Sequence, residues 1–209
     1  MQRAAFLIQA GFWVVCVDEK TSIQARERIH ESQPAAPSQP VHVAPRYHRR
    51  GAVHLFAALS VFDGLIYGGC RESKRFVDFQ SLRVEILVPE AIHRGVRHIY
   101  LILDNGSTHA PKQLQAWLNQ KQQQEGWSFT VRAVWLPTYA SWLDQIEIWF
   151  SILQRKLLTP NHFPNKETLQ QRLLEFIAHY NLSAKPIEWS YTVAQMKEKF
   201  ALVLTKFCT

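Results

Sequence analysis

Short apolar runs separated by polar segments predict several strands. Residues 13–18 form an apolar run that ends in Asp18, and residues 97–103 form a second run that leads into Asp104. Consecutive apolar positions are typical of strands buried on both faces. Residues 129–135 alternate between apolar and polar positions before Pro137, which predicts a further strand.

A β-hairpin and a long loop are predicted between the first two buried runs. The segments 53–62 and 65–72 are rich in apolar residues and flank Asp63-Gly64, a turn sequence that favours a hairpin. Residues 24–50 contain several prolines and then the polar stretch RYHRRG. This composition predicts an exposed loop over 24–50.

Apolar residues at helical spacing predict the helices. The predicted helices run from Phe76 to about His93, from about Pro111, from Leu143 to Leu157, from Leu169 to Tyr180, and from Trp189 onward. The order of elements is therefore β-β-β-α-β-α-β-α-α. This order is typical of a mixed α/β fold.

Composition and charge restrict the class of protein. The 209 residues, 47% of them hydrophobic, suffice for one domain with a full core. The formal net charge of +7 favours a polyanionic partner such as nucleic acid, although solubility alone would also explain it. Three separated cysteines without a CxxC pair argue against disulfides and structural zinc, which indicates a reducing, cytoplasmic setting. No apolar run approaches the roughly 20 residues of a membrane span.

Three carboxylates stand where the predicted structure changes. Asp18 and Asp104 end the two buried runs, and Glu147 lies early in a predicted amphipathic helix. Hard divalent cations such as Mg²⁺ take oxygen ligands, and two ions about 4 Å apart can bind both reacting oxygens in phosphoryl transfer. We therefore expect these three acids to converge on a divalent metal, which would also relieve their mutual repulsion.

Four segments carry a family resemblance: CVDEKTSIQARER, GAVHLFAALSVFDG, LILDNGSTHAPKQLQAWL and LPTYASWLDQIEIWFSILQRKLL. Together they resemble the IS630 branch of the IS630/Tc1/mariner transposases, over about residues 14–192. The resemblance implies a DDE-type endonuclease with an RNase H-like fold, a mixed five-stranded sheet flanked by helices. It implies that Asp18, Asp104 and Glu147 are the catalytic acids and hold Mg²⁺ or Mn²⁺, two ions in all.

The resemblance also implies a reaction and partners. The reaction would be cleavage of double-stranded DNA at transposon ends, followed by attack of the freed 3′-hydroxyl on target DNA. A homodimer and a location at the prokaryotic nucleoid are expected. The family normally has an N-terminal helix-turn-helix region, whereas this chain starts shortly before Asp18. Residues 1–209 are thus expected to be one catalytic domain, with any helix-turn-helix part encoded separately or lost by truncation.

Several neighbouring residues have two interpretations. Glu19 is a rival ligand, but strand alternation would turn it away from Asp18. His109 is either a structural histidine or an accessory group near the phosphate. Asp144 stands where the family usually has Asn, and it is either a further metal ligand or part of a capping box with Ser141.

Basic residues near these acids are candidates for contact with DNA phosphates, or else belong to a solvated surface. They are Lys20, Arg26, Arg46, Arg49, Arg50, Arg155 and Lys156. Three functions remain open at this point: an active DDE nuclease, a truncated descendant that only binds DNA or a partner, and an RNase H-type nuclease for RNA–DNA hybrids. The three acids favour the first, and the long LPTYASWLDQIE segment argues against the third.

Overall fold

The structure is a computed structural model, and five strands form its centre. It describes residues 2–30, 36–40, 45–109, 111–138, 140–188, 192, 194–195, 198 and 201.

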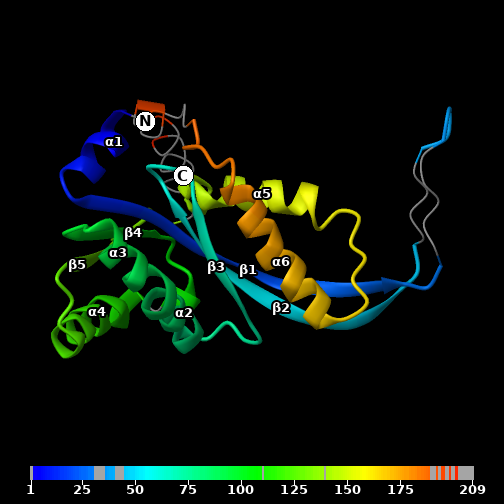
Figure 1. Cartoon of the computed structure of the whole chain (residues 1–209), viewed down its shortest axis with the longest axis horizontal. Helices are drawn as coiled ribbons and strands as arrows, with labels where there is room; N and C mark the ends of the chain where they lie inside the picture. The colour runs from blue at the N-terminus through cyan, green and yellow to red at the C-terminus, as the bar shows by residue number, and fades with distance from the viewer. Residues whose placement is uncertain are drawn as a thin grey trace.

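The five strands form one mixed sheet in the order β3-β2-β1-β4-β5 (Figure 1). The first three pair antiparallel, whereas β1, β4 and β5 run parallel to one another. This topology confirms the predicted mixed five-stranded sheet. The strands are β1 (Phe12–Arg28), β2 (Tyr47–Ser60), β3 (Ile66–Arg71), β4 (His98–Leu103) and β5 (Thr130–Trp135).

The turn between β2 and β3 is the predicted hairpin around Asp63-Gly64. Gly64 has φ +76° and donates its N–H to the Ser60 carbonyl oxygen at 2.8 Å. A Cβ at this position would lie 2.0 Å from the Lys185 carbonyl oxygen, so both the backbone conformation and the close approach require glycine. The Asp63 side chain accepts the Leu65 N–H at 3.1 Å and closes the turn.

The prediction of a loop over residues 24–50 is wrong at both of its ends. β1 continues to Arg28, which lies opposite Tyr47 at the start of β2. Buried Ile23 and Ala25 alternate with partly exposed residues there, and cross-strand hydrogen bonds satisfy the backbone of this polar sequence. An isolated bridge joins Ala36 to Gln39, and residues 31–35 and 41–44 lie outside the described part.

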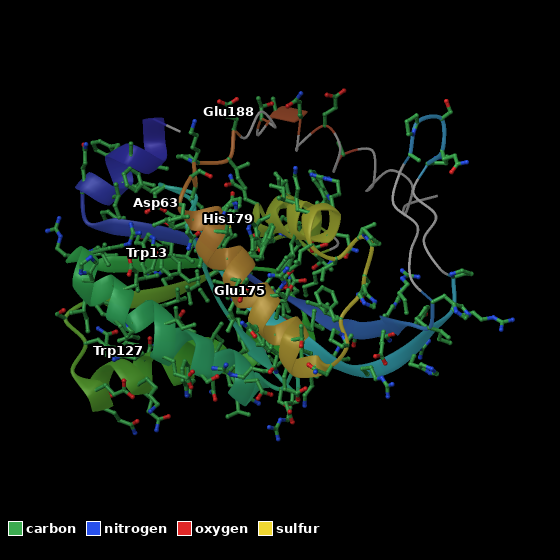
Figure 2. All side chains as sticks on the ribbon, turned by 45° about the vertical axis from the view of Figure 1, so that its right-hand side comes forward. Trp13, Asp63, Trp127, Glu175, His179 and Glu188 are labelled. Carbon is green, nitrogen blue, oxygen red and sulfur yellow. The ribbon has the colours of Figure 1, made fainter. Side chains whose placement is uncertain are left out.

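Helices α2 (Phe76–Leu82), α3 (Val88–Arg94) and α4 (Pro111–Glu125) belong to the layer on one face of the sheet. A π-helical turn (Arg83–Leu87) joins α2 to α3, so the predicted helix from Phe76 is confirmed with one irregular turn. Figure 2 shows Trp127 among these helices. The core of this layer includes Trp13, Val15, Val17, Phe56, Phe79, Leu101, Leu114 and Phe129.

Helices α5 (Ile146–Lys156) and α6 (Lys166–Asn181) pack against the opposite face, over β1 and β2 (Figure 1). Asn165 caps α6 by accepting the Thr168 N–H at 2.7 Å. Glu175 and His179 stand one turn apart on α6 (Figure 2). The core of this layer includes Cys16, Ile23, Val53, Leu55, Trp149, Phe150, Leu153, Leu169 and Leu173.

The N-terminal helix α1 (Gln2–Gln9) was not expected from the sequence pattern. The helix predicted from Trp189 falls mostly on residues outside the described part. Within the described residues, no helix combines the length and the apolar character needed to cross a membrane.

Candidate active site

The parallel pairing of β1 with β4 brings Asp18 and Asp104 to the same level of the sheet. Cys16 lies opposite Ile102 in this pair, and each acid follows two residues later on its own strand. Neighbouring strands lie about 4.8 Å apart, so carboxylates at equal height can approach one another. Two acids that are far apart in sequence therefore lie side by side.

The turn after β4 returns the chain toward Asp104. The Asp104 side chain accepts the Gly106 N–H at 2.8 Å, and the Asn105 side-chain amide donates to the Leu136 carbonyl oxygen at 2.6 Å. A short 3₁₀ turn (Ser107–His109) follows and places His109 Nδ1 2.8 Å from Asp104 Oδ1. The sequence LDNGSTH thus folds back so that its histidine pairs with its aspartate.

His109 lies between carboxylates from two strands. Its Nε2 is 3.1 Å from Glu19 Oε2 and 3.8 Å from Asp18 Oδ1. The ring packs against Phe79 with the centroids 4.5 Å apart, and only 1% of the residue is exposed. We refer to Asp18, Glu19, Asp104 and His109 as the acidic centre.

Burial and like charge make the acidic centre unfavourable for negative charge. Burial raises the pKa of Asp18 to about 8, and repulsion from Glu19 and Asp104 adds to this effect. Burial alone would lower the pKa of His109, but contacts with Asp104 and Glu19 raise it to about 9. The contact with His109 lowers the pKa of Asp104. His109 is therefore positively charged at neutral pH, and it contacts the negatively charged Asp104 and Glu19 side chains.

Asp144 is a further buried acid next to this region, with 1% of its surface exposed. Its Oδ1 accepts the Ile146 N–H at 3.3 Å. Burial raises its pKa to about 7, and repulsion from Asp104 and Glu147 contributes. The contact with Ile146 at the start of α5 supports a capping role, although the partner differs from the predicted Ser141.

Glu147 lies in the first turn of α5, and its side chain is exposed. Among the described residues, ligand atoms of Asp18, Asp104 and His109 lie within 4.8 Å of one another, and Glu147 is outside this group. The structure therefore brings together two of the three predicted acids. Asp144 lies between the two sets, since the charges of both Asp104 and Glu147 raise its pKa.

A cleft of about 280 Å³ borders the acidic centre. Its walls come from the turn after β4 and from the segment after β5, which leads into a 3₁₀ turn (Ser141–Leu143) and then α5. Asp104 is therefore open to solvent on this side. The cleft is lined by Asp104, Asn105, Gly106, Pro137, Thr138, Ala140 and Ser141.

The donor atoms of this region fit a hard divalent cation. Asp18 and Asp104 supply carboxylate oxygens that lie within 4.8 Å of each other. Oxygen ligands from a few carboxylates are what Mg²⁺ and Mn²⁺ take. A cation would also offset the burial and repulsion that raise the pKa of Asp18.

The predicted basic residues lie at three places. Arg46, Arg49 and Arg50 are exposed at the start of β2 or just before it, where Arg50 forms an ion pair with Glu27 at 2.6 Å. Arg155 and Lys156 are exposed in the last turn of α5. The remaining two, Lys20 and Arg26, are partly buried on β1.

Glu19 is the site residue that the sequence pattern set aside. Alternation along β1 predicted that it would point away from Asp18, yet His109 contacts both carboxylates. His109 lies in the 3₁₀ turn just beyond the end of β4, and its ring nitrogen reaches both neighbouring acids of β1. The adjacent pair Asp18-Glu19 at the end of an apolar run was the available signal.

A protein-family model settles the family. The model described as DDE superfamily endonuclease matches residues 13–170, most of the chain. The chain belongs to this family. The matched region contains Asp18, Asp104, Asp144 and Glu147.

One solved structure agrees with this assignment at the level of the fold, and a second is similar at a lower score. The paired-end complex of Mos1 transposase with the left transposon end is 14% identical with a TM-score of 0.54, covering 85% of this chain and 50% of that chain. The Mos1 mariner paired-end complex with Mn has a TM-score of 0.49 at 16% identity, covering 80% of this chain and 48% of that one. The chain thus spans about half the length of these transposase chains.

A more distant match is the HTLV-2 integrase catalytic core domain in complex with magnesium, at 11% identity and a TM-score of 0.36. It covers 80% of this chain and 82% of that chain. A search of curated proteins gives no match.

Proposed function

We propose that this chain is the catalytic domain of a DDE transposase of the IS630 branch. Its reaction is divalent-metal-dependent cleavage of DNA phosphodiester bonds at transposon ends, followed by strand transfer. One observation carries the proposal. Asp18 and Asp104 lie at the same height on adjacent parallel strands, in a chain of the DDE endonuclease family.

Asp18, Asp104 and Glu147 would hold Mg²⁺ or Mn²⁺, in two ions. The ions would neutralise charge on the phosphate oxygens and would stabilise the attacking and leaving oxygens. Asp18 and Asp104 provide the preformed half of the site. Glu147, exposed in the first turn of α5, would complete the site from the helix side.

The other residues of the region position these acids. His109 holds a proton between Asp104 and Glu19, which fixes the Asp104 carboxylate at the mouth of the cleft. Asp144 fixes the start of α5 through the Ile146 N–H and so sets the direction of Glu147. Backbone phosphates enter through the cleft beside Asp104, where Asn105 and Ser141 provide polar walls.

The substrate and partners follow from the same proposal. One matched structure is a Mos1 complex with the left transposon end, and the net charge of +7 suits a DNA partner. Arg46, Arg49, Arg50, Arg155 and Lys156 are proposed to contact the DNA backbone. We further propose a homodimer at the prokaryotic nucleoid, with terminal repeats read by a separately encoded helix-turn-helix part.

Cleavage of supercoiled plasmid with Mn²⁺ tests this function. The parent is expected to nick the plasmid, and Asp104→Ala is expected to lower the rate at least about 1,000-fold because half of the preformed site is lost. A far-ultraviolet circular dichroism spectrum shows whether the variant keeps its fold.

The matched control is Asp78→Ala, which removes an acid at the start of α2, outside the acidic centre. Its cleavage rate should equal that of the parent. Equal nicking by Asp104→Ala and the parent would refute the assignment. Cutting of an RNA–DNA hybrid in preference to duplex DNA would instead support an RNase H-type nuclease.

A further inference from the structure

β1 has a bulge that begins three residues after Asp18. The pairing of β1 with β2 is regular up to Lys20 and resumes at Ile23, so Thr21 and Ser22 are displaced from the ladder. Ser22 adopts φ +53° and donates its N–H to His54 Nδ1 at 3.3 Å. Bulges next to active sites redirect the side chains around them, and this one opens a hollow between β1 and the end of α5.

The hollow is a pocket of about 240 Å³ with positive and polar walls. Two of its residues, Lys20 and Arg26, are basic, and none is acidic. No ion pair joins either of them to an acid within the described residues, whereas Arg50 nearby is paired with Glu27. The lining residues are Lys20, Thr21, Ser22, Ile23, Gln24, Arg26, Gln154, Leu158 and Asn161.

The walls of this pocket are held in place before any ligand binds. The Asn161 side-chain amide donates to the Gln24 carbonyl oxygen at 2.8 Å, which ties the segment after α5 to β1. The Arg26 guanidinium lies over the Tyr47 ring at 4.7 Å, and Lys20 Nζ lies 6.0 Å from the Phe150 ring centroid. Aromatic contacts hold a cation without neutralising it, so both charges remain available to an anion.

The pocket lies a short distance along two elements from the proposed metal-binding acids Asp18 and Glu147. Lys20 follows Asp18 by two residues on β1, a rise of ~7 Å. Gln154 follows Glu147 by seven residues on the same side of α5, a rise of ~10 Å. One strand of DNA advances about 3.4 Å along the duplex axis for each nucleotide. The offset therefore corresponds to roughly two or three nucleotides.

We propose that this pocket binds one backbone phosphate of the DNA strand that is cleaved, two or three nucleotides from the scissile bond. The inference rests on the proposed nuclease function and adds a specific contact to it. A phosphodiester fits because the walls offer two cations together with hydroxyl and amide groups, and no carboxylate. Holding a second point of the strand fixes the register of the scissile phosphate at the acidic centre.

Fluorescence anisotropy with labelled duplex DNA in EDTA over a KCl series tests the contact without involving metal. Lys20→Gln and Gln154→Glu are each expected to weaken binding about five- to tenfold. Lys20→Gln should also lower the slope of log Kd against log[KCl] by about one. Gln154 is exposed on α5, so its substitution leaves the fold intact even if loss of Lys20 does not.

Lys112→Gln is the matched control, because Lys112 is an exposed lysine on α4 in the opposite layer. It should keep both the affinity and the slope of the parent. If both pocket variants bind DNA with the affinity of the parent, the proposed phosphate contact is wrong, even if the parent cleaves DNA. If the parent binds DNA through the pocket but never cleaves it, the nuclease function is wrong and the phosphate contact still holds.

Inorganic phosphate distinguishes the two sources of this anion. If the pocket serves DNA, millimolar phosphate should leave the melting temperatures of the parent and Lys20→Gln equally unchanged. Phosphate that stabilises the parent alone, with equal DNA affinities, would assign the pocket to free phosphate and overturn the DNA contact.

Discussion

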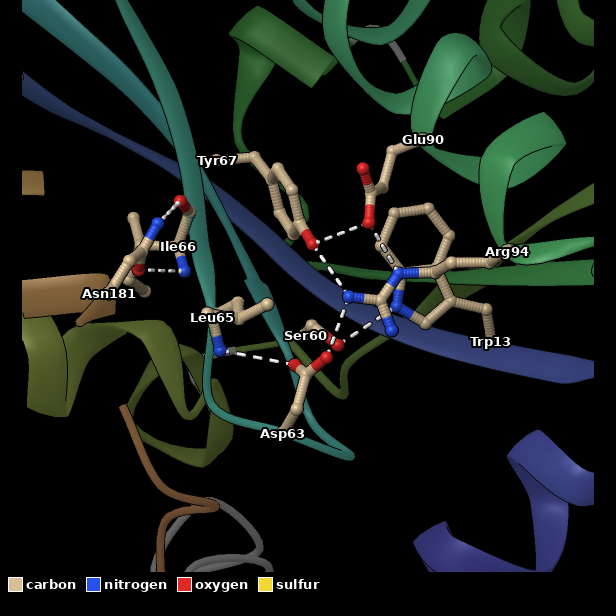
Figure 3. Close-up of polar contacts among 9 residues, drawn as sticks. All are labelled: Trp13, Ser60, Asp63, Leu65, Ile66, Tyr67, Glu90, Arg94 and Asn181. Carbon is tan, nitrogen blue, oxygen red and sulfur yellow. Dashed lines mark hydrogen bonds and ion pairs between the residues drawn. The ribbon is translucent and has the colours of Figure 1, made fainter. Parts of the chain in front are cut away.

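Two clusters of charged side chains in this molecule are built in opposite ways. In the first, the Arg94 network, Arg94 contacts Asp63 at 2.6 Å, Glu90 at 2.7 Å and the Tyr67 hydroxyl at 2.7 Å (Figure 3). Tyr67 in turn donates to Glu90 at 2.9 Å, and the guanidinium lies over the Trp13 ring. Every charge has a permanent partner, so this network ties the β2–β3 turn to α3.

The acidic centre lacks such compensation. Three carboxylates share one histidine, whose charge depends on a proton. Burial raises the pKa of Asp18 there, whereas the contacts with Asp63, Tyr67 and Glu90 keep Arg94 charged. The difference separates charge that stabilises the fold from charge that lacks fixed partners, which is the property expected of the proposed cation site.

Removal of the central cation of the Arg94 network should strongly lower stability. Arg94→Met leaves Asp63 and Glu90 without their partner in a mostly buried place, which should lower the free energy of unfolding by about 3 kcal/mol. Urea unfolding in EDTA measures this change. Arg94→Lys, which keeps the charge but loses the forked geometry, should fall between Arg94→Met and the parent. An Arg94→Met protein as stable as the parent would show that the network is not structural.

The acidic centre should respond in the opposite direction when a charge is removed. The folded pKa of Asp18 is raised to about 8, so its ionisation costs stability progressively above its ordinary pKa of about 4. Without metal, Asp18→Asn should therefore gain stability relative to the parent by ~2–4 kcal/mol between about pH 5 and pH 8.5. Urea unfolding at the two pH values measures the gain.

Asp78 provides a control of opposite sign. Burial alone would raise the pKa of Asp78, but hydrogen bonds from Ser73 and the Arg75 backbone lower it. Its carboxylate therefore contributes stability above its ordinary pKa, and that contribution is lost as the pH falls. Asp78→Asn should be less stable than the parent at both pH values. The same pH dependence for Asp18→Asn and the parent would contradict the account of the acidic centre.

The smallest expected effect concerns Asp144. An amide in Asp144→Asn can still accept the Ile146 N–H and leaves one charge less beside Asp104. Mn²⁺ affinity, measured by calorimetry, should therefore stay within about threefold of the parent. A large loss of affinity would show that Asp144 is a metal ligand rather than a cap.

The sequence predicted most of the sheet because its strands are apolar or end in a recognisable turn. Asp63-Gly64 specified the hairpin, and the two apolar runs specified the parallel pair. The outer half of β1 could not be recognised, because its polar residues become a strand only by pairing with β2. Helix α1 is short and was likewise not visible as a pattern.

The sequence predicted the part of the candidate site that depends on strand pairing, but not the part that depends on how the turns fold. Asp18 and Asp104 could be paired from strand ends alone, since parallel strands align them. The contact between Glu19 and His109 depends on how the turn after β4 folds back, which strand alternation does not contain. The exposed position of Glu147 depends on the direction of the first turn of α5, set by the contact of Asp144 with Ile146.

Titration of the metal-free protein with Mn²⁺ by calorimetry, beside Asp104→Asn and Arg94→Lys, is the most direct test of the acidic centre. The account predicts saturable binding by the parent and by Arg94→Lys, and loss of binding in Asp104→Asn. Binding should be accompanied by release of protons from Asp18, seen as a dependence of the heat on the buffer. Equal Mn²⁺ binding by Asp104→Asn and the parent, or no binding by a folded parent with DNA present, would contradict the account.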